Sequence, residues 1–75
     1  MKKYLNKDGH SGVSGYEVTR DSISVEFNHD AIYTYTYKSA GKKIVEKMKE
    51  LAIAGQGLST YISQSVRDKF ERKLR

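Results

Sequence analysis

Residues 22–37, SISVEFNHDAIYTYTY, decide the fold, because apolar and polar residues alternate on both sides of a polar break. Successive side chains of a β-strand point to opposite faces of a sheet, so this alternation predicts two strands that each have one apolar face. The break contains Asn28 and Asp30, residue types that suit left-handed turn positions. The stretch therefore predicts an antiparallel β-hairpin.

The length of the hairpin turn determines which way the tyrosine row points. A two-residue turn pairs Phe27 with Ile32 and turns the row toward water, where it forms a platform for nucleotide bases. A three-residue turn pairs Phe27 with Ala31 and places the row in the core. Burying an aromatic ring removes about 150–250 Å² from water, far more than a threonine, and a short chain needs that area. Packing therefore favours the three-residue turn, although the sequence leaves both registers open.

The flanking segments predict one more strand and two helices. Residues 14–20 alternate like the hairpin strands, so three strands form an antiparallel meander. A helix follows, with Ser39 as its N-cap and Gly55 as its end. Its apolar stripe consists of Ile44, Met48, Leu51 and Ala52. A second helix is predicted to run on toward residue 74, because its apolar residues recur at helical spacing: Leu58, Tyr61, Ile62, Val66, Phe70 and Leu74.

These elements, in the order βββαα, predict an α+β fold of two layers. Both helices pack on one face of a three-stranded antiparallel meander, and the opposite face, with Glu17, Ser24 and Glu26, is open to water. Residues 1–12 show no periodicity and predict a flexible basic N-terminal tail. Residues 13–75 are then expected to form a single domain.

The composition argues against several classes of function. The 75 residues include no cysteine, which excludes disulfides and a thiolate nucleophile, and two isolated histidines do not build a metal site. A catalytic triad, a Walker phosphate loop and a paired-carboxylate site are not found, so we expect no enzyme and no cofactor. No signal-peptide pattern and no run of about 20 apolar residues is present, which predicts a cytoplasmic protein that does not insert into a membrane.

The net charge of +5 is concentrated in the second half of the chain and in the tail. Residues 39–57 carry +2 and residues 58–75 carry +3, whereas residues 13–38, which include the tyrosine row, carry −2. Attraction to phosphates therefore favours RNA binding through the helices and the tail rather than through the sheet. The predicted nucleic-acid-binding residues are Lys42, Lys43, Lys47, Lys49, Arg67, Lys69, Arg72 and Lys73, followed by Arg75 at the end of the sequence.

Two other interpretations stay open. An ordinary solvated helix surface explains the same charges, because several of them are spaced four residues from an opposite charge, as in surface ion pairs: Lys42–Glu46, Arg67–Glu71 and Asp68–Arg72. A protein is the alternative partner, since a small sheet with free edges accepts a strand from another chain, and its open face can also be covered.

The order of motifs resembles the KTSC domain family. Tyr33 and Tyr35 follow a Val-x-Phe strand and a short turn, as the family's central Tyr-x-Tyr motif does. Further matches stand at the family's glycine, aromatic and aliphatic positions: Gly55, Leu58 and Ile62. The family occurs alone in bacterial proteins and at the C-terminus of some lysyl-tRNA synthetases, and RNA binding has been suggested for it. The resemblance covers most of residues 13–67 and implies a small α+β domain with an RNA-related role.

Overall fold

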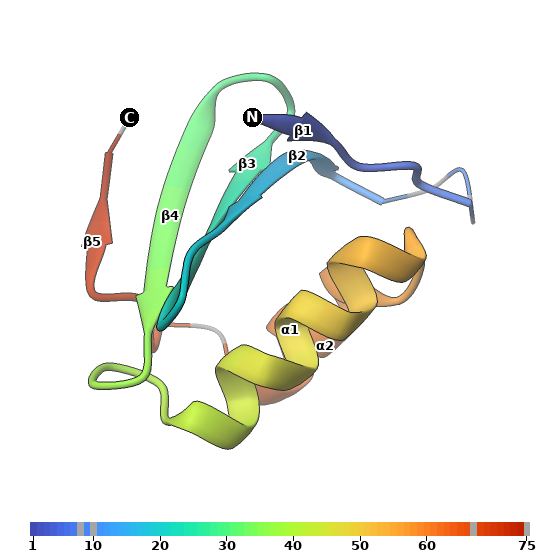
Figure 1. The fold of residues 1–75 in the computed structure, drawn as a ribbon. Helices are drawn as coiled ribbons and strands as arrows, with labels where there is room; N and C mark the ends of the chain where they lie inside the picture. The colour runs from blue at the N-terminus through green and yellow to red at the C-terminus, as the bar shows by residue number, and fades with distance from the viewer. Residues whose placement is uncertain (8, 10, 67, 75) are drawn as a thin grey trace.

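The chain folds into an antiparallel sheet with its helices on one face (Figure 1). This computed structural model describes residues 1–7, 9, 11–66 and 68–74. Within those residues the elements are β1 (Lys2–Lys3), β2 (Val13–Val18), β3 (Ser22–Phe27), β4 (Ala31–Thr36), α1 (Lys42–Ala54), α2 (Leu58–Tyr61), the π-helical η1 (Ile62–Val66) and β5 (Arg72–Lys73). The sheet order is β1-β2-β3-β4-β5. In the described part of the chain, no helix is long and apolar enough to span a bilayer.

The hairpin of β3 and β4 has the three-residue turn that packing favours. Phe27 pairs with Ala31, and Val25 pairs with Tyr33. Asn28 has a positive φ, as its residue type indicates, but the second such residue of the turn is His29 and not Asp30. This register turns the tyrosine row toward the helices, and Tyr35 is only 2% exposed. The prediction of a core-facing row is confirmed.

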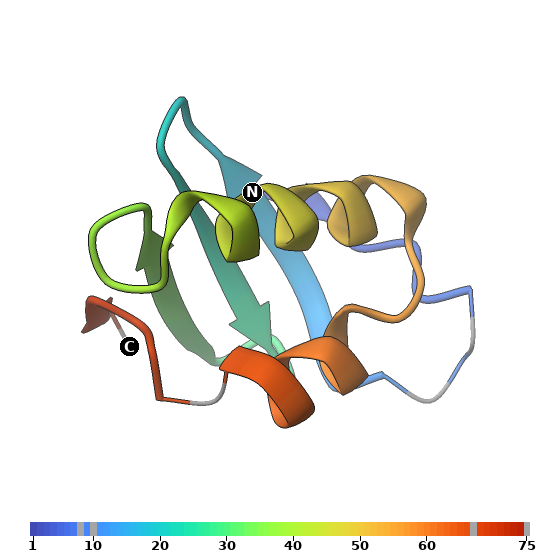
Figure 2. The same cartoon turned by 90° about the horizontal axis from the view of Figure 1, so that it is seen from below.

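The core lies between the sheet and the helix layer, which Figure 2 shows from the helix side. Its largest fully buried side chains are Tyr4, Ile23, Val25, Tyr35, Val45, Met48, Leu58 and Val66. These side chains come from the first residues of the chain, from both central strands and from all three helical elements. The whole chain therefore contributes to one core.

Helix α1 differs slightly from its prediction at its beginning. Its N-cap is Gly41, while the predicted cap, Ser39, accepts a hydrogen bond from the backbone N of Thr36 (3.1 Å) and so closes the preceding turn. Gly55 ends the helix in the left-handed conformation, as predicted. The buried face is rotated relative to the predicted stripe and consists of Val45, Met48 and Ala52.

The sheet of the described residues has five strands rather than the three of the predicted meander. β1 pairs Lys2 with Tyr16, and β5 pairs Lys73 with Tyr33. The three-stranded prediction was wrong because an exposed strand edge carries unpaired backbone groups, and the two ends of the chain supply partners for them. Strands of two basic residues have no alternation by which a sequence could reveal them.

The predicted N-terminal tail contributes to the domain. Tyr4 is 2% exposed, and its hydroxyl oxygen accepts a hydrogen bond from the backbone N of Leu58 (3.2 Å). The backbone N of Lys7 donates to the carbonyl oxygen of Gly55 (2.7 Å). These contacts fasten the N-terminal segment to the connection between α1 and α2. The prediction of a flexible tail over residues 1–12 therefore does not hold for Tyr4 and Lys7.

The second helix is shorter than predicted. α2 ends at Tyr61, the π-helical η1 follows to Val66, and the chain then runs to the sheet edge as β5 (Figure 2). The prediction of one helix toward Leu74 was wrong because tertiary contacts outweigh helical periodicity. Phe70 packs against the aromatic rings of β4, and the edge of β4 gains backbone hydrogen bonds.

Candidate nucleic-acid interface

An aromatic cleft opens between the β3–β4 hairpin and the segment that follows η1. Its volume is about 470 Å³, and its lining is Phe27, Ala31, Tyr33, Tyr35, Ile62, Asp68 and Phe70. The register of the hairpin explains this lining. Phe27 pairs with Ala31, so the side chains of Phe27, Ala31 and Tyr33 lie on the same face of the sheet. Both tyrosines of the proposed family motif therefore face the cleft.

The rings of the cleft meet edge to face. Ring centroids lie 5.8 Å apart for Phe27 and Tyr33, 4.8 Å for Tyr33 and Phe70, and 6.3 Å for Tyr35 and Phe70. Each such pair stabilises the fold by about 0.5–1.5 kcal/mol beyond the area it buries. Three of these rings, on Phe27, Tyr33 and Phe70, stay half-buried. Their outer surfaces are therefore accessible to a planar ligand.

Tyr35 is the most deeply buried ring of the cleft. Burial, and to a smaller extent the neighbouring Tyr33, raises the pKa of Tyr35 to about 12. A phenol with the ordinary pKa of 10.0 is already protonated at neutral pH, so Tyr35 adds no negative charge to the cleft, and the raised pKa extends this to higher pH. The acidic residue of the lining is Asp68, which is exposed.

Two of the predicted basic residues lie beside this cleft. Lys73 Nζ is 5.6 Å from the centroid of the Tyr33 ring, on the face that the helices cover. Lys69 is exposed and stands between Asp68 and Phe70, both of which line the cleft. Aromatic surface next to positive charge is the combination that single-stranded nucleic acids require, because bases stack and phosphates are neutralised.

The remaining predicted residues of the C-terminal segment are placed differently. Arg72 pairs with Thr34, so its side chain points to the open face of the sheet. The predicted helical pair of Asp68 and Arg72 is not formed as such, because Arg72 belongs to β5. Arg67 and Arg75 lie outside the described residues.

Two of the predicted basic residues of α1, Lys43 and Lys47, line a second cleft. The predicted basic residues of α1 that are exposed are Lys42, Lys43 and Lys47. The second cleft, of about 430 Å³, lies between α1 and α2 and is lined by Lys43, Glu46, Lys47, Glu50 and Tyr61. Lys47 is paired with Glu50 at 3.5 Å. Two lysines therefore meet two glutamates here, and the cleft has little excess positive charge.

Lys49 is engaged within the protein. Its side chain is 12% exposed, its Nζ lies 2.8 Å from the Glu46 carboxylate, and it donates to the carbonyl oxygen of Arg20 (3.0 Å). The hydroxyl of Tyr37 donates to the same carboxylate (2.5 Å). Hydrogen bonds from Lys49 and then from Tyr37 lower the pKa of Glu46. This cluster joins α1 to the end of β4 and to the β2–β3 turn, so Lys49 is occupied by internal contacts.

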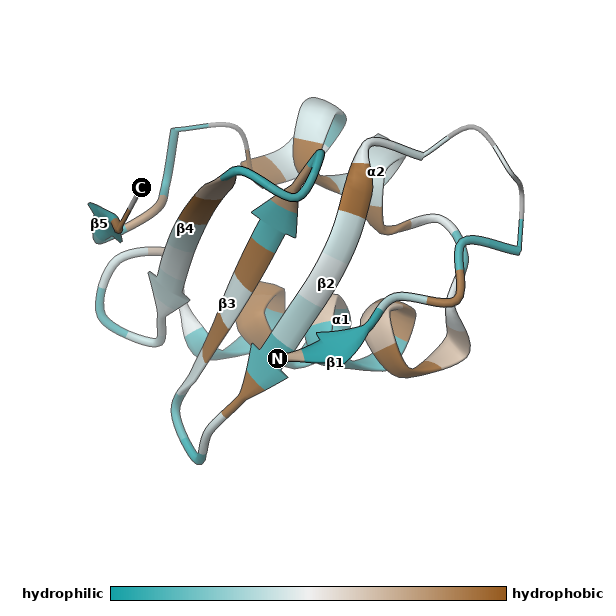
Figure 3. Cartoon of the chain, turned by 90° about the horizontal axis from the view of Figure 1, so that it is seen from above, coloured by the Kyte–Doolittle hydropathy of each residue, from teal (hydrophilic) through white to brown (hydrophobic). Residues whose placement is uncertain are grey.

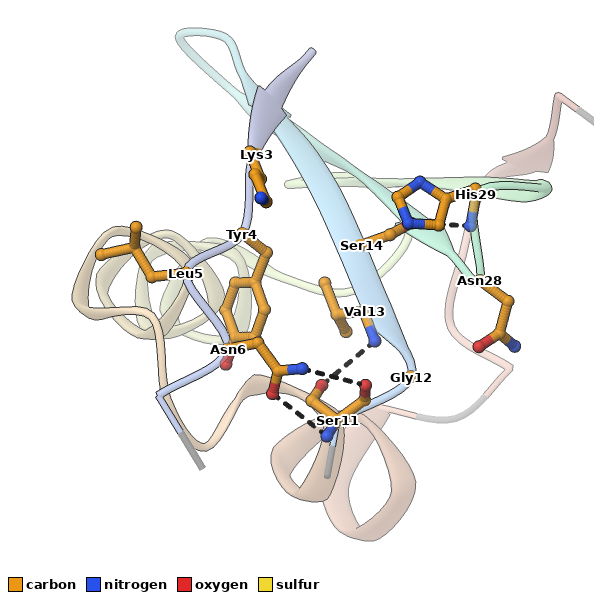
Figure 4. Close-up of a pocket in the computed structure, with 10 residues that line it drawn as sticks. All are labelled: Lys3, Tyr4, Leu5, Asn6, Ser11, Gly12, Val13, Ser14, Asn28 and His29. Carbon is orange, nitrogen blue, oxygen red and sulfur yellow. Dashed lines mark hydrogen bonds between the residues drawn. The ribbon is translucent and has the colours of Figure 1, made fainter. Parts of the chain in front are cut away.

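A polar pocket of about 320 Å³ lies between the N-terminal segment and the end of the β3–β4 hairpin (Figure 4). Three of its polar side chains, those of Asn6, Ser11 and Ser14, bind backbone groups of the same lining. Asn6 Oδ1 accepts from the backbone N of Ser11 (3.1 Å), and Ser11 Oγ accepts from the backbone N of Val13 (3.1 Å). Ser14 Oγ accepts from the backbone N of His29 (2.8 Å). These bonds fasten the loop to β2 and to the hairpin turn, which accounts for the polar lining.

Two residues of the aromatic cleft were missed as site residues in the sequence. Alternation predicts Phe27 only as part of the apolar face of a strand, and helical spacing predicts Phe70 in the stripe of a second helix. The sequence separates them by more than half its length, so no local pattern connects them.

In the described residues, no group of three His, Cys, Asp or Glu side chains is placed to hold a metal ion. Comparisons of the chain with known protein families, with curated proteins and with solved structures found no match. The resemblance to the KTSC family therefore stays a prediction.

Proposed function

We propose that this chain is a non-enzymatic cytoplasmic binding domain of the KTSC type that holds single-stranded RNA at its aromatic cleft. One base contacts the accessible surfaces of Phe27, Tyr33 and Phe70, while Lys69 and Lys73 neutralise the adjacent phosphates. The observation that carries the proposal is the position of Lys73, whose ammonium group lies 5.6 Å from the centroid of the Tyr33 ring within this cleft. RNA is chosen over DNA because of the family resemblance.

The charges of the helix layer favour the aromatic cleft, rather than the surface of α1, as the place where RNA binds first. Lys49 is bound by Glu46 and by a backbone carbonyl, and Lys47 is paired with Glu50. An exposed ion pair contributes little stability, but it does cancel the field that attracts phosphate. Around the aromatic cleft, Asp68 is the acidic residue of the lining, and Lys69 and Lys73 outnumber it.

The alternative of a protein partner that adds a strand to the sheet has less support. Both edge strands of the described residues consist of two basic residues, and Figure 3 shows them as hydrophilic ends of the sheet. Short, charged edge strands are a known means of blocking strand addition. A partner could also cover the open face of the sheet. There, the hydroxyl groups of Ser24 and Thr34 are already hydrogen-bonded to each other (2.8 Å).

The test is fluorescence anisotropy with a labelled single-stranded RNA of about 12 nucleotides at several salt concentrations. Binding is expected to weaken with salt, with a slope of about −0.7 in log K against log salt for each phosphate contact. Lys73→Glu should weaken binding and flatten this slope. Lys42→Glu, which makes the same charge change on α1, is the matched control and should have a smaller effect.

Stacking is tested separately from charge. Tyr33→Leu keeps an apolar side chain in the cleft but removes the aromatic ring, so affinity should fall by about 1–3 kcal/mol. Tyr61→Leu, at the second cleft, is the matched control and should leave affinity unchanged. Absence of binding at low salt would overturn the proposal. Equal losses of affinity in each variant and its matched control would show that RNA does not bind at the cleft.

A further inference from the structure

The C-terminal segment, residues 68–74, is held to the edge of β4 by a small set of contacts, and we call it the strap (Figure 1). The backbone N of Glu71 donates to the carbonyl oxygen of Thr34, and the backbone N of Leu74 donates to that of Ile32, both at 2.7 Å. These bonds lie at the edge of the sheet, where both residues of β5 are exposed.

Phe70 is the apolar anchor of the strap. Its ring lies in the aromatic cleft, 4.8 Å from that of Tyr33 and 6.3 Å from that of Tyr35. The last apolar residue, Leu74, is 53% exposed. The other contacts of the strap are a two-residue strand, a hydrogen bond from Thr36 Oγ1 to the Glu71 carboxylate (2.9 Å) and the approach of Lys73 to the Tyr33 ring. All of them lie at the edge of the sheet, so we expect this part of the molecule to be among the first to open.

The sequence of the strap also fits a second conformation. The apolar residues of residues 58–74 keep the spacing of an α-helix, whereas the structure changes from α to π geometry after Tyr61. π-Helical turns are rare. The backbone N of Lys69 donates to the carbonyl oxygen of Val66 (2.8 Å), and Phe70 lies in the cleft rather than on a helix. A helix continued through the strap would satisfy this spacing and would carry the strap away from its own sheet.

We propose that two copies of this chain exchange straps, so that the strap of each copy pairs with β4 of the other and its Phe70 fills the other's aromatic cleft. The edge of β4 and the cleft already fit this segment, and exchange recreates its contacts with β4 and with the cleft between chains. The main free-energy cost of exchange is then the entropy lost when two chains associate. β4 itself, AIYTYT, has no charged side chain that would repel a basic strap. This inference does not depend on RNA binding.

The absence of cysteine from the sequence permits a direct test with two single-cysteine variants. Thr34→Cys places a thiol on β4, and Arg72→Cys places one on the residue that pairs with it in β5. Cα atoms of antiparallel partners lie about 4.5–5.5 Å apart, which a disulfide can bridge. The two variants are mixed, kept reduced at high concentration, oxidised, and then analysed on a denaturing gel without reductant.

Strap exchange predicts a covalent heterodimer at about ten times the yield of a control mixture at about 0.1 mM protein, because exchanged straps hold the thiols at roughly millimolar effective concentration. The control mixture is Thr34→Cys with Lys43→Cys, whose thiol lies on the exposed side of α1. Equal yields in the two mixtures would overturn the proposal. The unmodified chain provides a second measurement: sedimentation should show its mass doubling with concentration, and a single-chain mass throughout would also overturn it.

Discussion

At the scale of single residues, Gly55 is the point where the helix layer meets the N-terminal segment. Its φ is +77°, and a Cβ added there would lie 2.6 Å from the Cβ of Leu5. Glycine is therefore needed both for the left-handed backbone and for the close approach of Leu5. Gly55→Ala is expected to lower the free energy of unfolding by about 2–4 kcal/mol, as measured by urea denaturation.

The matched control for Gly55 is Gly57→Ala. Gly57 has a φ of +79°, but the nearest atom to an added Cβ is Leu51 Cδ2 at 3.7 Å, an ordinary contact. This variant should lose only the conformational term, about 1–2 kcal/mol. Equal losses for the two variants would show that Leu5 does not lie against Gly55.

Tyr35 makes stability sensitive to alkaline pH. Its pKa is raised from 10.0 to about 12 by burial, so above pH 10 the unfolded chain loses this proton while the folded chain retains it. The contribution of the Tyr35 phenol to the free energy of unfolding is complete below pH 10 and is lost as the pH rises toward 12. By about pH 11 the loss is about 1 kcal/mol. Tyr35→Phe should show a correspondingly smaller decrease in unfolding free energy between about pH 9 and pH 11, and an unchanged decrease would contradict the burial.

At the scale of elements, the central hairpin was predictable because its information is local. Alternation over residues 22–37 predicts both strands, and the packing value of the rings predicts the register that Phe27 and Ala31 adopt. The end of the second helix was not predictable in this way. Phe70 has the right spacing for a helix, but it packs on rings of β4 that are distant in the sequence. The two-residue strands likewise depend on an edge that exists only in the folded sheet.

The strap should be the least protected element of the sheet. Amide hydrogen exchange reports local opening, so the amide protons of Glu71 and Leu74 are expected to exchange faster than those within the β3–β4 pair. Phe70→Ala should accelerate exchange of both strap amides further, because it removes the apolar anchor. Protection of the strap equal to that of β3 would contradict a weak attachment and with it the route to strap exchange.

At the scale of the whole molecule, both ends of the chain complete the sheet, and the N-terminal end also fills the core. Tyr4→Ala should therefore destabilise the protein by about 3–5 kcal/mol in thermal or urea unfolding, as truncation of a buried aromatic does. The neighbouring Leu5 is 63% exposed, and Leu5→Ala is expected to cost less than about 1 kcal/mol. A Tyr4→Ala variant as stable as the unmodified chain would show that the first residues are a tail after all.

The candidate site was predictable only in part. Composition and charge predicted RNA binding by the lysines and arginines of the second half. Of these, Lys73 lies beside the aromatic cleft, and Lys69 is next in sequence to two of its lining residues. The sequence did not reveal that Lys49 is held by internal contacts. Its ammonium group binds Glu46 and also a backbone carbonyl of the β2–β3 turn, and the second contact joins residues that are distant in the sequence. Nor did it reveal the cleft, which needs Phe27 and Phe70 on either side of Tyr33.

The most direct test of RNA binding at the cleft is an NMR titration of the unmodified chain with single-stranded RNA at low salt. The proposal predicts that the ring signals of Phe27, Tyr33 and Phe70 shift first and furthest, together with the backbone signals of Lys69 and Lys73. Shifts confined to α1, or no shifts at all, would contradict it.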